Sequence, residues 1–127
     1  MKGITMPLEF ESITGEIIGA AFEVRKILGY GFLERVYQRA MQVELGLRGI
    51  RCEIEQAITV VYKGNVVGDY RADLFVEDSV IVELKVGKEY SSADEPQLLN
   101  ELKATGVKVG LLINFGKSKV EFKRFVF

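Results

Sequence analysis

Histidine is absent from this chain of 127 residues, and cysteine occurs only once, as Cys52. Without histidine the chain has no imidazole base and no imidazole metal ligand, which leaves oxygen atoms as the expected ligands of any metal. A single cysteine excludes an intramolecular disulfide, and we therefore expect a cytoplasmic protein.

The chain also lacks a long apolar run and an excess of charge of one sign. No stretch is apolar over the length that a membrane helix needs, and the first residues lack the apolar segment of a signal peptide. The net charge of -1 predicts no overall basic field for nucleic acid, although a local basic patch remains open. With 48% hydrophobic residues, the chain suits one domain over residues 1–127.

Hydrophobic periodicity predicts three helices and five strands after an N-terminal arm at residues 1–8. The helices are expected over residues 9–28, 32–47 and 93–104, and the strands over 53–63, 66–76, 80–86, 107–115 and 119–127. This order, ααβββαββ, predicts an α/β (α+β) fold with a mixed sheet flanked by helices. A helical crossover between the third and fourth strands would make them parallel.

The stretch YRADLFVEDSVIVELKV, residues 70–86, predicts a hairpin with one apolar face. Side chains alternate between the two faces of a strand. The even positions are all apolar or aromatic: Tyr70, Ala72, Leu74, Val76, Val80, Val82, Leu84 and Val86. The odd positions include Asp73, Glu83 and Lys85. A three-residue loop at residues 77–79 keeps the apolar face intact and sets Asp73 opposite Glu83, whereas a two-residue loop would separate the carboxylates.

Like charges directly opposite each other destabilise a sheet, so a cation is expected near Asp73 and Glu83. Lys85 is one candidate, and a divalent metal is the other. Two carboxylates on neighbouring strands suit Mg²⁺, and a lysine beside them could orient a water or stabilise an anionic transition state. The alternative is a solvated sheet face with a Glu–Lys pair of little energetic value.

Two further residues could reach the same face of the sheet. Glu34 lies in the first turn of the second helix, where it could be a third acidic ligand or simply complement the helix dipole. Gln97 begins the third helix and could approach the charged end of the hairpin, or be a surface glutamine. The basic residues near the C-terminus (Lys117, Lys119, Lys123 and Arg124) could track a phosphate backbone or protect an edge strand, and the second interpretation is favoured.

Several motifs resemble the GxxExxY protein family, which is grouped with the PD-(D/E)XK nuclease-like superfamily. Gly31, Glu34 and Tyr37 fit the pattern that names the family. The resemblance continues in order through most of the chain, at residues 62–64, 70–74, 82–85, 97–100, 102–106 and 110–116. It implies a restriction-endonuclease-like core.

Carried over to this chain, the resemblance implies that Asp73 and Glu83 bind Mg²⁺, with Mn²⁺ as a possible substitute. It adds the backbone carbonyl of Leu84 as a ligand, Lys85 as the residue that positions the attacking water, and Glu34 and Gln97 as auxiliary residues. The chain departs from the resemblance at Arg25 and Tyr30, where the family favours histidine and proline. It also departs at Glu101, where several nuclease branches carry tyrosine.

The leading hypothesis is a Mg²⁺-dependent nuclease that acts on nucleic acid, with DNA as the first candidate. The main alternative is a catalytically inactive module on the same fold that binds nucleic acid or a protein partner. A metal-dependent enzyme acting on a smaller phosphate ester is a third possibility. So small a domain offers little surface beyond its core, and a homodimer or a protein partner could supply more. No membrane partner is expected.

Overall fold

The computed structural model describes residues 2–87, 93–116 and 118–127, with side chains from residue 11 onward. These residues form one α+β domain with the expected element order. The helices are α1 (Lys2–Leu28), α2 (Glu34–Leu47) and α3 (Asp94–Thr105). The strands are β1 (Cys52–Tyr62), β2 (Asn65–Val76), β3 (Val80–Lys85), β4 (Val109–Asn114) and β5 (Glu121–Val126).

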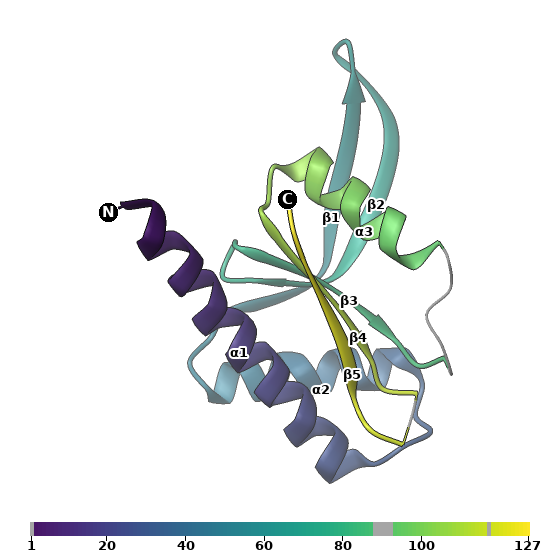
Figure 1. Ribbon diagram of the computed structural model, residues 1–127. Helices are drawn as coiled ribbons and strands as arrows, with labels where there is room; N and C mark the ends of the chain where they lie inside the picture. The colour runs from purple at the N-terminus through teal and green to yellow at the C-terminus, as the bar shows by residue number, and fades with distance from the viewer. Residues whose placement is uncertain (1, 88–92, 117) are drawn as a thin grey trace.

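The five strands form one sheet in the order β1-β2-β3-β4-β5. Strands β3 and β4 are parallel, as expected from the helical crossover, and the other neighbouring pairs are antiparallel. Helices α1 and α2 cover one face of the sheet, whereas α3 covers the other (Figure 1). The central strands β3 and β4 are buried on both faces, as the near-continuous apolar sequence of β4 predicted.

Two hydrophobic cores lie on opposite faces of this sheet. The larger core joins α1 and α2 to the sheet through residues that include Ile17, Met41, Leu74, Val82 and Leu111. The smaller core lies under α3: Ile58, Ala72, Ile81, Leu98, Leu102 and Leu112. Burying a leucine fully contributes about 1.5–3 kcal/mol, so both faces of the sheet contribute to stability.

The predicted register of the β2–β3 hairpin is confirmed. Val76 pairs with Val80 and Leu74 with Val82. The loop has three residues, and the N–H of Ser79 donates to the carbonyl of Val76 at 2.9 Å. Leu74, Val76, Val80, Val82 and Leu84 all face the larger core.

The prediction of one continuous apolar face is wrong in the outer half of the hairpin. Ala72 packs in the smaller core beside Ile58 instead of following Leu74 into the larger one, and Tyr70 is 46% exposed. Glu55, on β1, has a left-handed backbone with φ 57°. Twist accumulates along long strands, and the β1–β2 hairpin runs past α3 (Figure 1). A period-two pattern shows alternation but not which helix each segment meets.

The sequence Lys63-Gly64-Asn65 is a turn signal that would suit a three-residue loop, but the turn between β1 and β2 has two residues, Lys63 and Gly64. Both have positive φ, at 49° and 82°, as a tight hairpin turn of this handedness requires. A register shift between Val60 and Val61, just before the turn, restores the pairing that a three-residue loop would give, in which Ile58 faces Tyr70.

Helix ends differ from the sequence prediction in three places. Helix α1 begins at Lys2, so the residues expected to form an arm are helical from that point. Helix α2 begins at Glu34, and Leu33 is 77% exposed instead of packing on the core. Residues 92–95 have the form of a capping box for α3, but Ser92 lies outside the described residues, and the N-cap is Ala93 with no side-chain cap. Leu99, expected to face inward, is exposed.

Candidate functional site

The candidate site begins where β2 and β3 stop pairing. Their last paired residues are Leu74 and Val82. One step further on, the Asp73 Oδ2 atom accepts a hydrogen bond from the backbone N–H of Leu84 at 2.7 Å. The side chain of Asp73 therefore replaces a backbone carbonyl of β2 as the acceptor for the Leu84 N–H. Burial raises the pKa of Asp73, while the Leu84 N–H opposes that rise.

Glu83 is buried beside a second glutamate, Glu101 of α3, and only 4% and 1% of these residues are exposed. Burial raises the pKa of both, and Glu83 is raised further by its hydrogen bond to Glu101 and by the charge of Asp73. A carboxyl pair can hydrogen-bond only by sharing a proton. Even so, Glu83 Oε2 and Glu101 Oε1 have no protein hydrogen-bond partner among the described residues.

Gln97, predicted to approach the site, lies one helical turn before Glu101. Its Nε2 donates to Glu101 Oε2 at 3.4 Å, which is a long hydrogen bond. Gln97 therefore contacts the site through Glu101.

Lys85 lies on the acidic side of the sheet, as expected, and forms an ion pair with Asp94. Lys85 Nζ is 3.4 Å from Asp94 Oδ1 at the start of α3. Burial favours the neutral amine, but the charges of Asp94 and Glu34 outweigh it and raise the pKa of Lys85. Lys85 is therefore a cation in this arrangement and not a base.

Glu34 occupies the first turn of α2, as predicted, and is half-buried near Asp73 and Lys85. Burial and the charge of Asp73 raise the pKa of Glu34, whereas Lys85 lowers it. The structure thus brings a carboxylate of the helical layer within electrostatic range of the sheet residues.

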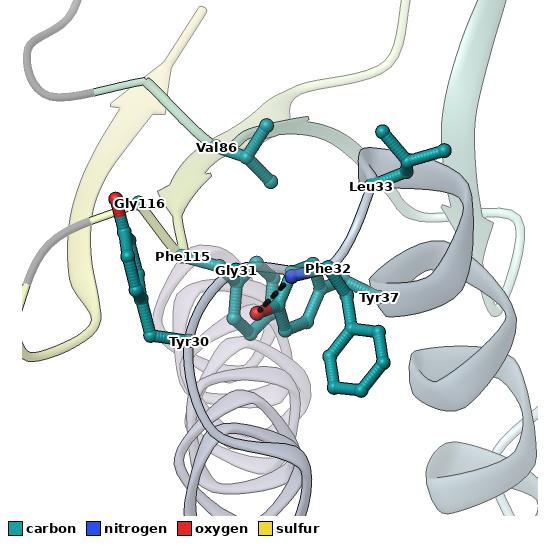
Figure 2. A pocket seen from close by; sticks show the side chains of 8 residues that line it. All are labelled: Tyr30, Gly31, Phe32, Leu33, Tyr37, Val86, Phe115 and Gly116. Atoms are coloured by element: carbon teal, nitrogen blue, oxygen red, sulfur yellow. Dashed lines mark hydrogen bonds between the residues drawn. The ribbon is translucent and has the colours of Figure 1, made fainter.

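The link between α1 and α2 sets the start of the helix that carries Glu34. Tyr37 donates its hydroxyl proton to the carbonyl of Gly29 at 2.7 Å and accepts the N–H of Phe32 at 3.3 Å. Its ring stacks on Phe115 with centroids 4.5 Å apart, as Figure 2 shows. Gly31 has φ 109°, which a side chain would disfavour. Gly31 and Tyr37 therefore fix the turn that places Glu34.

The same link lines a cavity of about 240 Å³ (Figure 2). Its walls are Tyr30, Gly31, Phe32, Leu33, Tyr37, Val86, Phe115 and Gly116. Leu33 and Val86 directly precede Glu34 and follow Lys85 in the chain, so the cavity adjoins the candidate site.

Sequence reasoning missed Gln38 and Glu55. Gln38 is buried and donates to Glu55 Oε2 at 2.6 Å and to the backbone carbonyl of Asp73 at 3.0 Å. Its place four residues after Glu34, on the same helix face, was a usable signal. Glu55 gave no such signal, because its proximity depends on the left-handed backbone of β1.

One of the basic residues near the C-terminus has an acidic partner on α3. Lys117 lies outside the described residues. Lys123 Nζ is 2.7 Å from Glu95 Oε2, joining edge strand β5 to α3. This contact agrees with the structural interpretation of the basic segment rather than with a phosphate track.

The donor set fits a hard divalent cation, although the described residues contain no group of three or more acidic or cysteine side chains arranged to hold an ion. Mg²⁺ commonly uses only one or two carboxylates and completes its octahedron with water. Asp73 and Glu83 supply two, and the unpartnered buried oxygen of Glu83 would gain a partner from such an ion.

A mixed five-stranded sheet between helices, with acidic residues where two strands part, defines a restriction-endonuclease-like fold. The sequence profile described as the PD-(D/E)XK nuclease superfamily matches residues 11–125, and the chain belongs to that superfamily. Among solved structures, the chain is similar to one titled "Crystal structure of SSO0001", with 16% identity and a TM-score of 0.56. The match covers 73% of this chain and 50% of the other, so this chain spans about half the length of that protein.

No curated protein matches the chain. Among the described residues, no helix is long and apolar enough to cross a membrane.

Proposed function

We propose that this protein hydrolyses phosphodiester bonds of nucleic acid in a Mg²⁺-dependent reaction, with DNA as the first candidate substrate. One observation carries the proposal. Asp73, Glu83 and Lys85 gather on one side of the sheet, where β2 and β3 part, in a chain of a nuclease superfamily. Glu34 and Gln97 approach the same place from the two helical layers.

Asp73 and Glu83 would hold the metal, with the Leu84 carbonyl and Glu34 as further ligands and Mn²⁺ as a substitute. Bound there, Mg²⁺ would neutralise charge on a phosphoryl oxygen and lower the pKa of a ligated water. Lys85 keeps its proton at Nζ, so it would orient the attacking water as a hydrogen-bond donor and stabilise the negative transition state.

A cleavage assay tests this function. Purified protein is incubated with nicked, branched and single-stranded DNA, and with RNA, in Mg²⁺ or Mn²⁺. We expect Asp73→Asn and Lys85→Ala to lower the cleavage rate by about 100-fold or more. Asp69→Asn is the matched control, because Asp69 lies on the same strand, paired with Thr59 in the outer half of the hairpin, and should cleave as wild type does.

The proposal fails if wild type and Asp73→Asn show the same trace activity, since that activity would come from a contaminant. The comparison of substrates then separates DNA from RNA and duplex from single strand.

The second candidate is a nuclease-fold module without catalysis. It is favoured by one observation: Lys85 is engaged by Asp94, and Glu83 by Glu101. A titration with Mg²⁺ and Mn²⁺ separates the two. Metal binding that Glu83→Gln abolishes supports the nuclease, whereas retained nucleic-acid binding without metal binding supports the module.

A further inference from the structure

We propose that Glu101 of α3 is a ligand of the divalent cation held by Glu83, so that the ion joins α3 directly to β3. This inference rests on the proposed metal site and adds a ligand from an element outside the hairpin. The resemblance by itself assigned no metal-binding role to position 101, because several nuclease branches carry tyrosine there.

Two buried oxygens carry the inference. Glu83 is 4% exposed and Glu101 is 1% exposed, yet Glu83 Oε2 and Glu101 Oε1 each lack a hydrogen-bond partner in the part of the chain that the structure describes. A buried polar atom without a partner destabilises the folded protein, and a charged one does so more strongly. A divalent cation ligated by both carboxyl groups would remove that destabilising effect at both residues.

Nearby hydrogen-bond donors and cations are directed at other atoms. Gln97 donates to Glu101 Oε2 and leaves Oε1 available. Lys85 pairs with Asp94. The Leu84 N–H is taken by Asp73. Apart from the proton that the two carboxyl groups share, none of these donors reaches Glu83 Oε2 or Glu101 Oε1.

The packing of α3 gives the ligand a rigid support. Leu98 and Leu102, on either side of Glu101 along the helix, are fully buried in the smaller core. Glu101 therefore meets Glu83 from a fixed helix. Metal binding should then stabilise α3 against the sheet.

Calorimetric titration of the full chain with Mn²⁺ alone, and with Ca²⁺ alone, tests the inference independently of cleavage. We expect Glu101→Gln to weaken Mn²⁺ binding by about 10-fold or more. Glu95→Gln is the matched control, because Glu95 lies on the same helix and pairs with Lys123, and its affinity should equal that of wild type. Glu101→Gln can still donate to Glu83, so its melting temperature without metal should be equal or higher.

The outcomes separate this inference from the proposed function. If Glu101→Gln binds Mn²⁺ as wild type does while Asp73→Asn does not, Glu101 only shares a proton with Glu83, and the inference is overturned but the proposed function stands. If wild type binds no divalent cation, both fail. Should Glu101→Gln not fold, Glu101→Asp keeps the charge with a shorter reach, and an unchanged Mn²⁺ affinity in that variant overturns the inference.

Discussion

At the scale of single residues, the unusual feature is a cluster of carboxyl groups near one lysine, Lys85. Asp73, Glu83, Glu101 and Glu34 all have raised pKa values, chiefly because burial disfavours their charged forms. Natural proteins rarely bury acidic groups without a partner, and perturbed pKa values cluster at functional sites. A bound cation would therefore offset part of the free-energy cost of burying these carboxyl groups in their charged forms.

The raised pKa of Glu83 predicts a pH dependence of stability in the absence of metal. The unfolded chain releases the Glu83 proton near the ordinary value of 4.5, whereas the folded chain holds it to higher pH. The contribution of Glu83 to stability is therefore fully present below about pH 4.5 and is lost as the pH rises toward its folded-state pKa of about 10. Urea unfolding in a chelating buffer should show that Glu83→Gln reduces the loss between pH 5 and pH 8 by about 1 kcal/mol or more.

Glu95→Gln serves as the control for this measurement, because Glu95 is a partly exposed partner of Lys123 and should leave the slope unchanged. A Glu83→Gln slope equal to that of wild type would mean that Glu83 ionises normally in the folded chain.

At the scale of elements, the start of α2 depends on the contacts of Tyr37 with the link before the helix and with Phe115. Tyr37 ties the link before the helix to the helix itself and to Phe115 just after β4. This link has no side-chain cap for α2, since the N-cap residue is Leu33. The Tyr37 hydroxyl instead satisfies polar groups of the link, and Glu34 follows it into position.

Tyr37→Phe should therefore destabilise the protein by about 1–3 kcal/mol, because the Gly29 carbonyl and the Phe32 N–H both lose the hydroxyl. Chemical denaturation measures the effect. Tyr30→Phe removes the same atom from a ring that is 64% exposed, and it should change stability by less than about 0.5 kcal/mol. Equal effects of the two substitutions would show that the Tyr37 hydroxyl has no special role.

At the scale of the whole molecule, the ends of β3 and β4 must approach closely behind the site. A Cβ atom on Gly116 would lie 2.1 Å from the Val86 carbonyl oxygen, so no side chain fits without moving backbone. The Phe115 N–H donates to the Lys85 carbonyl at 2.7 Å in the same place. This contact holds the end of β3, which carries Glu83 and Lys85, against the end of β4.

We expect Gly116→Ala to lower the melting temperature markedly, with a loss of about 3 kcal/mol or more, because backbone atoms would have to separate. Gly15→Ala is the matched control. Gly15 lies within α1 with no atom near its added Cβ, so the same change should stabilise the protein by about 0.5–1 kcal/mol. A Gly116→Ala protein as stable as wild type would show that the close approach is dispensable.

The sequence by itself determined the order of elements, the parallel pairing of β3 with β4 and the register of the β2–β3 hairpin. These features depend on periodicity and on local turns, which are properties of neighbouring residues. Alternation alone selected the three-residue loop at residues 77–79, and that loop sets the register in which Asp73 approaches Leu84 and Glu83.

Only the tertiary structure decided which groups from distant elements complete the cluster. Glu101 meets Glu83 because α3 packs across the sheet, and Glu55 comes near because β1 bends at a left-handed residue. The outer half of the β1–β2 hairpin packs in the smaller core with α3 instead of in the larger core, because twist accumulates over a long strand. Such contacts depend on the relative placement of whole elements, which the local pattern of a single sequence does not contain.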